Sequence, residues 1–126
     1  MRAVDTNVLV RLIARDDPRQ VSAAEAFVAN GAWVSNLALA EATWVLSSVH
    51  ELKSPQIATA VGMLLNHQNL ILQDPDVVSG ALNRFLERPG IGFSDCLMLQ
   101  VAAKAGHLPL GTFDRNLAKL EGVARL

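Results

Sequence analysis

Short apolar segments alternate along this chain with longer helix-forming segments, and this alternation constrains the fold more than any other feature. Asp17 with Pro18 and Asp74 with Pro75 mark helix starts, because an aspartate can cap the first turn and a proline fits its first position. Gly31 follows the first of these two helices, where glycine commonly ends a helix. The pattern predicts an α/β domain whose parallel sheet has helices on both faces.

Such helix-start and helix-end signals divide the whole chain into predicted strands and helices. We predict strands at residues 2–4, 33–35, 70–72, 108–112 and 123–126. We predict helices at residues 8–14, 18–30, 36–50, 54–67, 75–88 and 94–105, and a short helix that Asp114 opens. With no repeat, linker or low-complexity stretch, residues 1–126 form one domain. The expected architecture is a three-layer α/β/α fold around a central, mostly parallel sheet of four to five short strands.

Composition excludes several classes of protein. Hydrophobic residues make up 51% and charged residues 18%, which excludes a disordered chain. No apolar stretch approaches the ~20 residues that cross a bilayer, so no membrane association is expected. Asp5 and Arg11 interrupt the N-terminal apolar stretch, and Cys96 is the single cysteine, so we expect neither export nor an internal disulfide but a cytoplasmic protein. A net charge of −1 excludes a strongly basic nucleic-acid binder.

Three aspartates follow, or lie close to, the ends of predicted strands. Asp5 follows the first strand, Asp114 follows the strand at residues 108–112, and Asp95 lies at the expected start of a helix. Ligands of parallel α/β sheets bind beyond the carboxyl ends of the strands, so Asp5 and Asp114 are expected to lie close together there. The alternative is that each aspartate only caps a helix.

Glu41 is unusual because it lies in an apolar stripe of its helix. Its neighbours at helical spacings of three and four are Leu37, Ala38, Trp44 and Val45. A carboxylate in such surroundings needs a partner. Glu41 therefore either emerges at the margin of the stripe, or pairs with an arginine, or points toward the three aspartates.

A cluster of these four acids would require a cation. Two carboxylates 4 Å apart repel by about 4 kcal/mol at an effective dielectric constant of 20. Oxygen ligands without histidine or cysteine suit Mg²⁺ or Mn²⁺. Such ions activate water and stabilise the leaving oxygen of a phosphodiester, so the cluster would be a nuclease site.

Four stretches of the chain together resemble the PIN-domain ribonucleases, and among them the VapC-like toxins of bacterial toxin–antitoxin modules. The stretches are VDTNVLVRL around Asp5, SNLALAEATWVL around Glu41, IGFSDCLMLQVA around Asp95 and LGTFDRNLAKL around Asp114. The resemblance covers the whole chain, and every acidic position of the family pattern is filled. It implies a metal-dependent endoribonuclease with these four acids as its catalytic, metal-binding site, and Asp5 and Asp95 as the most direct Mg²⁺ ligands.

The resemblance also implies neighbours and partners for the acids. Asn7 and Thr112 match polar positions near the site. RNA is the implied substrate, a homodimer the implied assembly, and a cognate antitoxin the implied inhibitor. The predicted helices at 8–14 and 37–49 fit such an inhibitor, because they carry more apolar side chains than one sheet face covers; the alternative is a well-filled core. These side chains are Leu9, Leu12, Ile13, Leu39, Leu46 and Val49.

Two pairs of basic residues are candidates for the rim of an RNA site. Arg84 and Arg88 are four residues apart before the loop that leads to Asp95, and Arg115 and Lys119 repeat this spacing after Asp114. Each pair either contacts phosphates or forms solvated faces and local salt bridges.

Three other functions compete with the ribonuclease. A receiver domain is excluded, because no aspartate occurs between Asp17 and Asp74 to accept a phosphoryl group. A catalytically inactive PIN-like module that binds a protein partner, and another Mg-dependent phosphoester hydrolase, remain as alternatives.

Overall fold

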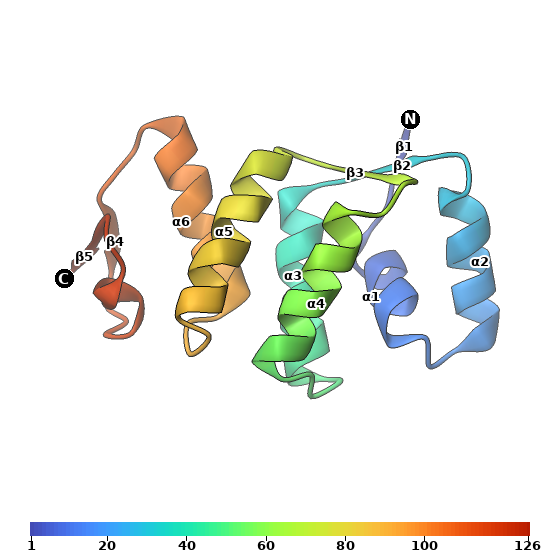
Figure 1. The fold of residues 1–126 in the computed structure, drawn as a ribbon, viewed down its shortest axis with the longest axis horizontal. Helices are drawn as coiled ribbons and strands as arrows, with labels where there is room; N and C mark the ends of the chain where they lie inside the picture. The colour runs from blue at the N-terminus through green and yellow to red at the C-terminus, as the bar shows by residue number, and fades with distance from the viewer.

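The computed structural model describes residues 1–126 and consists of six helices, five short strands and one turn of 3₁₀ helix (Figure 1). The elements in chain order are β1 (Arg2–Ala3), α1 (Thr6–Ala14), α2 (Pro18–Val28), β2 (Ala32–Val34), α3 (Asn36–Ser48), α4 (Ser54–Leu65), β3 (Leu70–Leu72), α5 (Pro75–Glu87), α6 (Phe93–Ala105), β4 (Leu110–Thr112), η1 (Leu117–Lys119) and β5 (Val123–Arg125). The predicted α/β class is confirmed, and the element order is that of a three-layer α/β/α fold. None of the helices combines the length and hydrophobicity of a membrane span.

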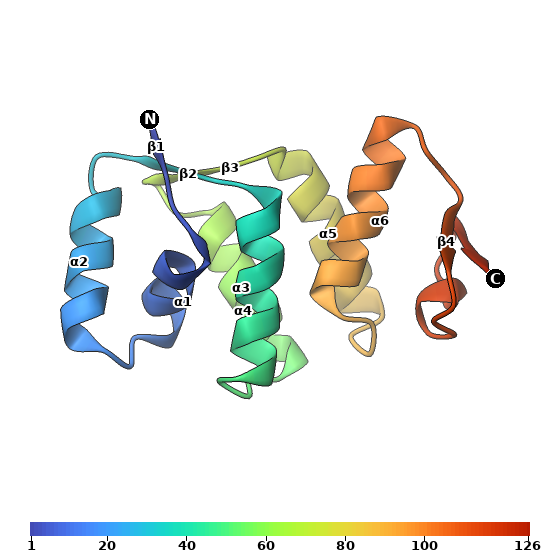
Figure 2. The same ribbon diagram turned by 180° about the vertical axis from the view of Figure 1, so that it is seen from behind.

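All five strands pair in parallel, but they form two sheets rather than the single central sheet that we predicted. One sheet has the order β1-β2-β3, and the other consists of β4 and β5. Figures 1 and 2 show the elements in a row, with β1 on one side of α3 and α6, and β4 and β5 on the other. Asp5 follows β1 and Asp114 follows β4, so the two strands that lead to these aspartates are not neighbours within one chain.

Side-chain caps explain why three of the six helices, α1, α2 and α3, begin where they do. Asp5 Oδ1 accepts the N–H of Val8 at 3.2 Å, and Asp17 Oδ1 accepts the N–H of Gln20 at 3.1 Å. Both contacts satisfy a donor that the first turn leaves unpaired. The helix predicted at residues 94–105 begins one residue earlier, at Phe93, and its N-cap is Gly92 rather than Ser94 or Asp95.

A second boundary differs near the C-terminus. Asp114 does not open a helix of its own: the 3₁₀ turn begins three residues later, at Leu117. The Asp114 side chain nevertheless accepts the N–H groups of Asn116 and Leu117, so it organises the turn that leads into η1.

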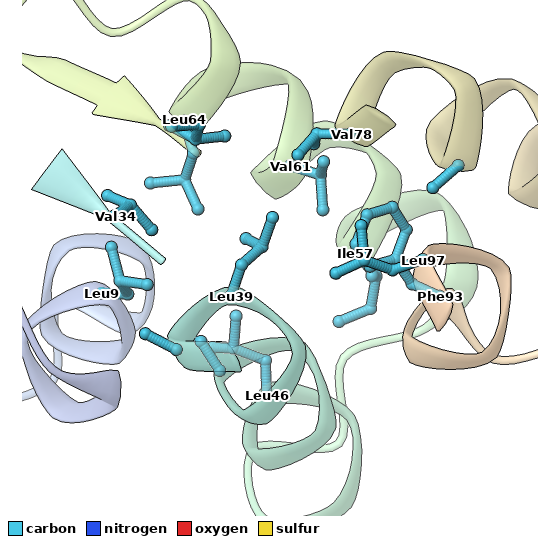
Figure 3. Packing of buried hydrophobic residues seen from close by; sticks show 14 of the residues in the cluster. Leu9, Val34, Leu39, Leu46, Ile57, Val61, Leu64, Val78, Phe93 and Leu97 are labelled. Atoms are coloured by element: carbon cyan, nitrogen blue, oxygen red, sulfur yellow. The ribbon is translucent and has the colours of Figure 1, made fainter. Parts of the chain in front are cut away.

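One hydrophobic core of 28 buried residues extends from α1 to the C-terminal segment. Leu39 lies at its centre, close to Val34 and Val61 in Figure 3, and is 1% exposed. Burying a leucine of this kind stabilises the fold by about 1.5–3 kcal/mol. Of the apolar side chains that we expected in excess on α1 and α3, Leu9, Leu12, Leu39 and Leu46 belong to this core, whereas Val49 is exposed.

Candidate active site

The first part of the candidate site lies where β1 ends and α1 begins, beside α3. Asp5 is exposed and caps α1, and Asn7 is exposed in the first turn of the same helix. Thr6 donates a hydrogen bond from Oγ1 to Glu41 Oε2 at 2.9 Å. This contact holds the Glu41 carboxylate against Thr6, the residue that follows Asp5 in the chain. We call Asp5, Thr6 and Glu41 the β1 half-site.

Glu41 lies in an apolar stripe of α3, as predicted, but this part of the stripe is exposed. The residue is exposed, and its neighbours Leu37 and Trp44 on the same face are 72% and 63% exposed. Its partner is a hydroxyl group rather than an arginine. Sequence reasoning missed Thr6, although its place directly after Asp5 in the stretch DTN was the available signal.

The second part lies around the start of α6 and the end of β4. Asp95 is half-buried in the first turn of α6, and Asp114 is exposed after β4. Burial raises the pKa of the Asp95 carboxyl, and the negative charge of Asp114 raises this pKa further. Thr112 Oγ1 accepts the N–H of Asp114 at 3.0 Å, so Thr112 supports this residue as predicted. We call Asp95, Asp114 and Thr112 the β4 half-site.

The structure does not bring the four acids of one chain together. No group of three or more histidine, cysteine, aspartate or glutamate side chains is close enough to hold a metal ion. The reason is the division of the sheet, since β1 and β4 are separate edge strands. As one chain arranges them, the carboxylates therefore do not fit a complete Mg²⁺ or Mn²⁺ site, although their oxygen chemistry does.

Of the four basic residues predicted at the rim of an RNA site, one is engaged within the fold and three are not. Arg84 is half-buried and donates from Nε to Gln100 Oε1 at 2.7 Å, so it ties α5 to α6 instead of facing RNA. Arg88 and Lys119 line one shallow cavity of about 280 Å³, and Arg115 is exposed next to Asp114. These three cations remain available for phosphate.

A larger cavity, of about 630 Å³, lies beside the start of α6 and was not predicted. Its lining includes the exposed ring of Trp44, together with Lys53 and Ser94. The Trp44 ring is 63% exposed and therefore does not pack in the core. Phe93, in contrast, begins α6, is 3% exposed, and packs edge to face against Phe85 with 5.9 Å between ring centroids.

Comparison with known proteins identifies the family. The family model of the PIN domain matches residues 2–123. The searches of curated proteins and of solved structures gave no match. Because the family model spans almost the entire chain, including all four acidic stretches, this protein belongs to the PIN-domain family.

Proposed function

We propose that the protein is a divalent-metal-dependent endoribonuclease, and that it is the VapC-like toxin of a toxin–antitoxin module in the cytoplasm. PIN domains are generally nucleases and typically use divalent metal ions. The observation that carries the proposal is the way in which two aspartates are presented at the carboxyl ends of parallel strands. Asp5 and Asp114 each lie two residues beyond the last residue of a strand, Ala3 in β1 and Thr112 in β4.

Each of these aspartates is anchored by one oxygen and leaves the other free of protein hydrogen bonds. Asp5 Oδ1 accepts the N–H of Val8, and Asp114 Oδ1 accepts the N–H of Asn116 at 2.8 Å. The two Oδ2 atoms remain for a cation or for water. Backbone donors therefore hold both carboxylates in fixed orientations, as the preorganised ligands of a catalytic site require.

The chemistry of these side chains favours Mg²⁺ or Mn²⁺ as the cofactor. The candidate ligands Asp5, Glu41, Asp95 and Asp114 supply only oxygen atoms. A bound ion of this kind activates water and neutralises charge on a phosphodiester. Arg88, Arg115 and Lys119 are the cations that would hold neighbouring phosphates of the RNA.

The test is cleavage of a single-stranded RNA by the purified protein with Mg²⁺ or Mn²⁺. Asp5→Asn should reduce the rate at least about a hundredfold, because it removes a charged ligand. Asparagine is also a good N-cap, so the start of α1 is retained. The matched control is Asp17→Asn, which makes the same change at the cap of α2 and should leave the rate unchanged. Cleavage that persists in EDTA would contradict the proposed metal dependence, and no cleavage would favour an inactive interaction module.

The exposed face of α3 supports an inhibitory partner. Leu37 and Trp44 are two helical turns apart on one face, and Glu41 lies between them. An apolar segment of an antitoxin that covers both side chains would also cover Glu41, and a basic side chain in it would compete with the cation. Expression of this chain alone should stop growth, and the product of a small neighbouring gene should co-purify with it and restore growth. Harmless expression would contradict the toxin role and leave the nuclease untouched.

A further inference from the structure

We propose that the complete active site forms between two copies of this chain, with β1 of one copy paired in parallel with β4 of the other. The catalytic part of this inference rests on the proposed function. Its pairing part rests on the free edges of the two sheets and can be tested without any measurement of activity.

Hydrogen bonds show which backbone groups of β1 and β4 are free. The N–H of Val4 donates to Trp33 O at 3.1 Å, so the backbone of Val4 faces β2. Successive residues of a strand face opposite edges, so the N–H and C=O of Ala3 face outward. In β4, the N–H of Leu110 donates to Gly122 O at 2.9 Å, so the outward groups belong to Gly111. Each sheet thus has a free parallel edge.

The strands β1 and β4 are more exposed than the parallel strands β2 and β3 of this chain. Parallel strands are normally buried. In β2 and β3, the two residues of each strand that point into the core are buried, and only the middle residue is exposed. Both residues of β1 are exposed, and β4 has no buried residue. At the carboxyl end of the β4–β5 sheet, Phe113 and Leu126 are 81% and 71% exposed. Unpaired edges of this kind readily pair with a strand of another chain.

The spacing of the aspartates selects the register. If Ala3 lies opposite Thr112, the N–H of Ala3 meets the C=O of Gly111, and both free edges are satisfied. The same register places Asp5 opposite Asp114 on strands about 4.8 Å apart. It therefore joins the β1 half-site of one copy to the β4 half-site of the other. The four acids that one chain keeps apart become one cluster, which is the donor set that the proposed cation needs.

The packing of α6 favours a second copy over closure within one chain. This helix packs along α5 and against α3. Arg84 bonds Gln100, and Lys104 Nζ donates to Asp74 Oδ1 at 3.0 Å. Only residues 106–109 link α6 to β4, and four residues span at most about 14 Å. To reach β1 of its own chain, on the far side of α3 and α6 (Figure 2), β4 would have to pull α6 from the core. Reciprocal pairing of two copies leaves α6 in place and closes both edges in a symmetric dimer.

A disulfide test measures the pairing directly. In a Cys96→Ala background, Ala3→Cys with Thr112→Cys places two thiols on directly opposite residues, within the 4.4–6.8 Å range of Cα separations that a disulfide bridges. We expect oxidation to give a covalent dimer on a non-reducing gel, with no such product from the control Ala3→Cys with Glu121→Cys, whose second thiol is exposed away from the free edge. A cross-linked monomer, or no cross-link at all, would overturn the proposal.

Mixing two inactive variants tests whether the site is shared. Asp5→Asn and Asp114→Asn homodimers each lack one acid in both sites, whereas a mixed dimer has one site with both acids. After exchange of an equimolar mixture, half of the dimers are mixed, so the expected rate is about a quarter of the wild-type rate. A site within one chain would show no recovery and would overturn the shared site. If the wild type cleaves no RNA, the proposed function fails, while the disulfide test still decides the pairing.

Discussion

The contact between Phe85 and Phe93 should contribute measurably to the stability of the fold and to the position of Asp95. Both rings are 3% exposed, and they meet at an interplanar angle of 89°. Phe93 is the first residue of α6, two residues before Asp95, so its ring fixes where this helix begins. Truncation of a buried phenylalanine to alanine costs about 3–5 kcal/mol. For a domain with about 5–15 kcal/mol of total stability, Phe93→Ala should lose a large share of it.

A double-mutant cycle separates the ring contact from general burial. Phe85→Leu and Phe93→Leu each retain an apolar side chain, and the coupling between them should be about 0.5–1.5 kcal/mol, the energy of an edge-to-face pair. The free energy of unfolding is measured by urea denaturation at one protein concentration, because in the proposed dimer it would depend on that concentration. The control Met63→Ala, at a side chain that is 57% exposed, should change it by no more than about 0.5 kcal/mol. A coupling near zero, or a Phe93→Ala cost below about 1 kcal/mol, would refute this packing.

Two further predictions follow from the surroundings of α6. Burial and the charge of Asp114 raise the pKa of Asp95 above its usual 3.8, so the native state binds the proton of this carboxyl more tightly than the unfolded state does. Protonation of Asp95 therefore stabilises the native state. This stabilisation is complete below pH 3.8 and is lost as the pH rises through the raised pKa. The unfolding free energy of Asp95→Asn should therefore equal that of the wild type near pH 3 and exceed it at pH 7. Equal unfolding free energies at pH 7 would contradict this account of the Asp95 charge. Burial, followed by the charge of Asp95, raises the pKa of the Cys96 thiol to about 11. Cys96 of the native protein should therefore react with a disulfide reagent at pH 8 at least roughly a hundredfold more slowly than Cys96 of the unfolded chain. Equal rates would place the thiol at the surface.

The local elements could be predicted from the sequence because their signals are local. Asp17 with Pro18 starts α2, and the segment at residues 70–72 is the strand β3, as expected. The start of α6 was misplaced because Gly92, an N-cap without a side chain, offers no hydrogen-bonding signal.

The arrangement of the sheet could not be predicted in the same way. The strands at residues 110–112 and 123–125 are apolar enough to pair, but their sequences do not determine which strand each of them pairs with. For the same reason the hydrogen-bond partner of Glu41 could not be predicted. The neighbours of Glu41 along its helix are apolar, and its hydrogen bond comes from Thr6, 35 positions away in the chain. Whether the four acids form the predicted metal site stays a prediction.

The way in which Asp5 and Asp114 are anchored has a consequence for how this chain tolerates change. Their Oδ1 atoms accept hydrogen bonds from the backbone of Val8 and Asn116, so the donors survive any substitution except proline at those positions. Mutations that reshape the outer surfaces of α1 or of the C-terminal turn leave these two carboxylates aimed as before. The chain can therefore accumulate changes in what it recognises without first having to rebuild the orientation of its acids.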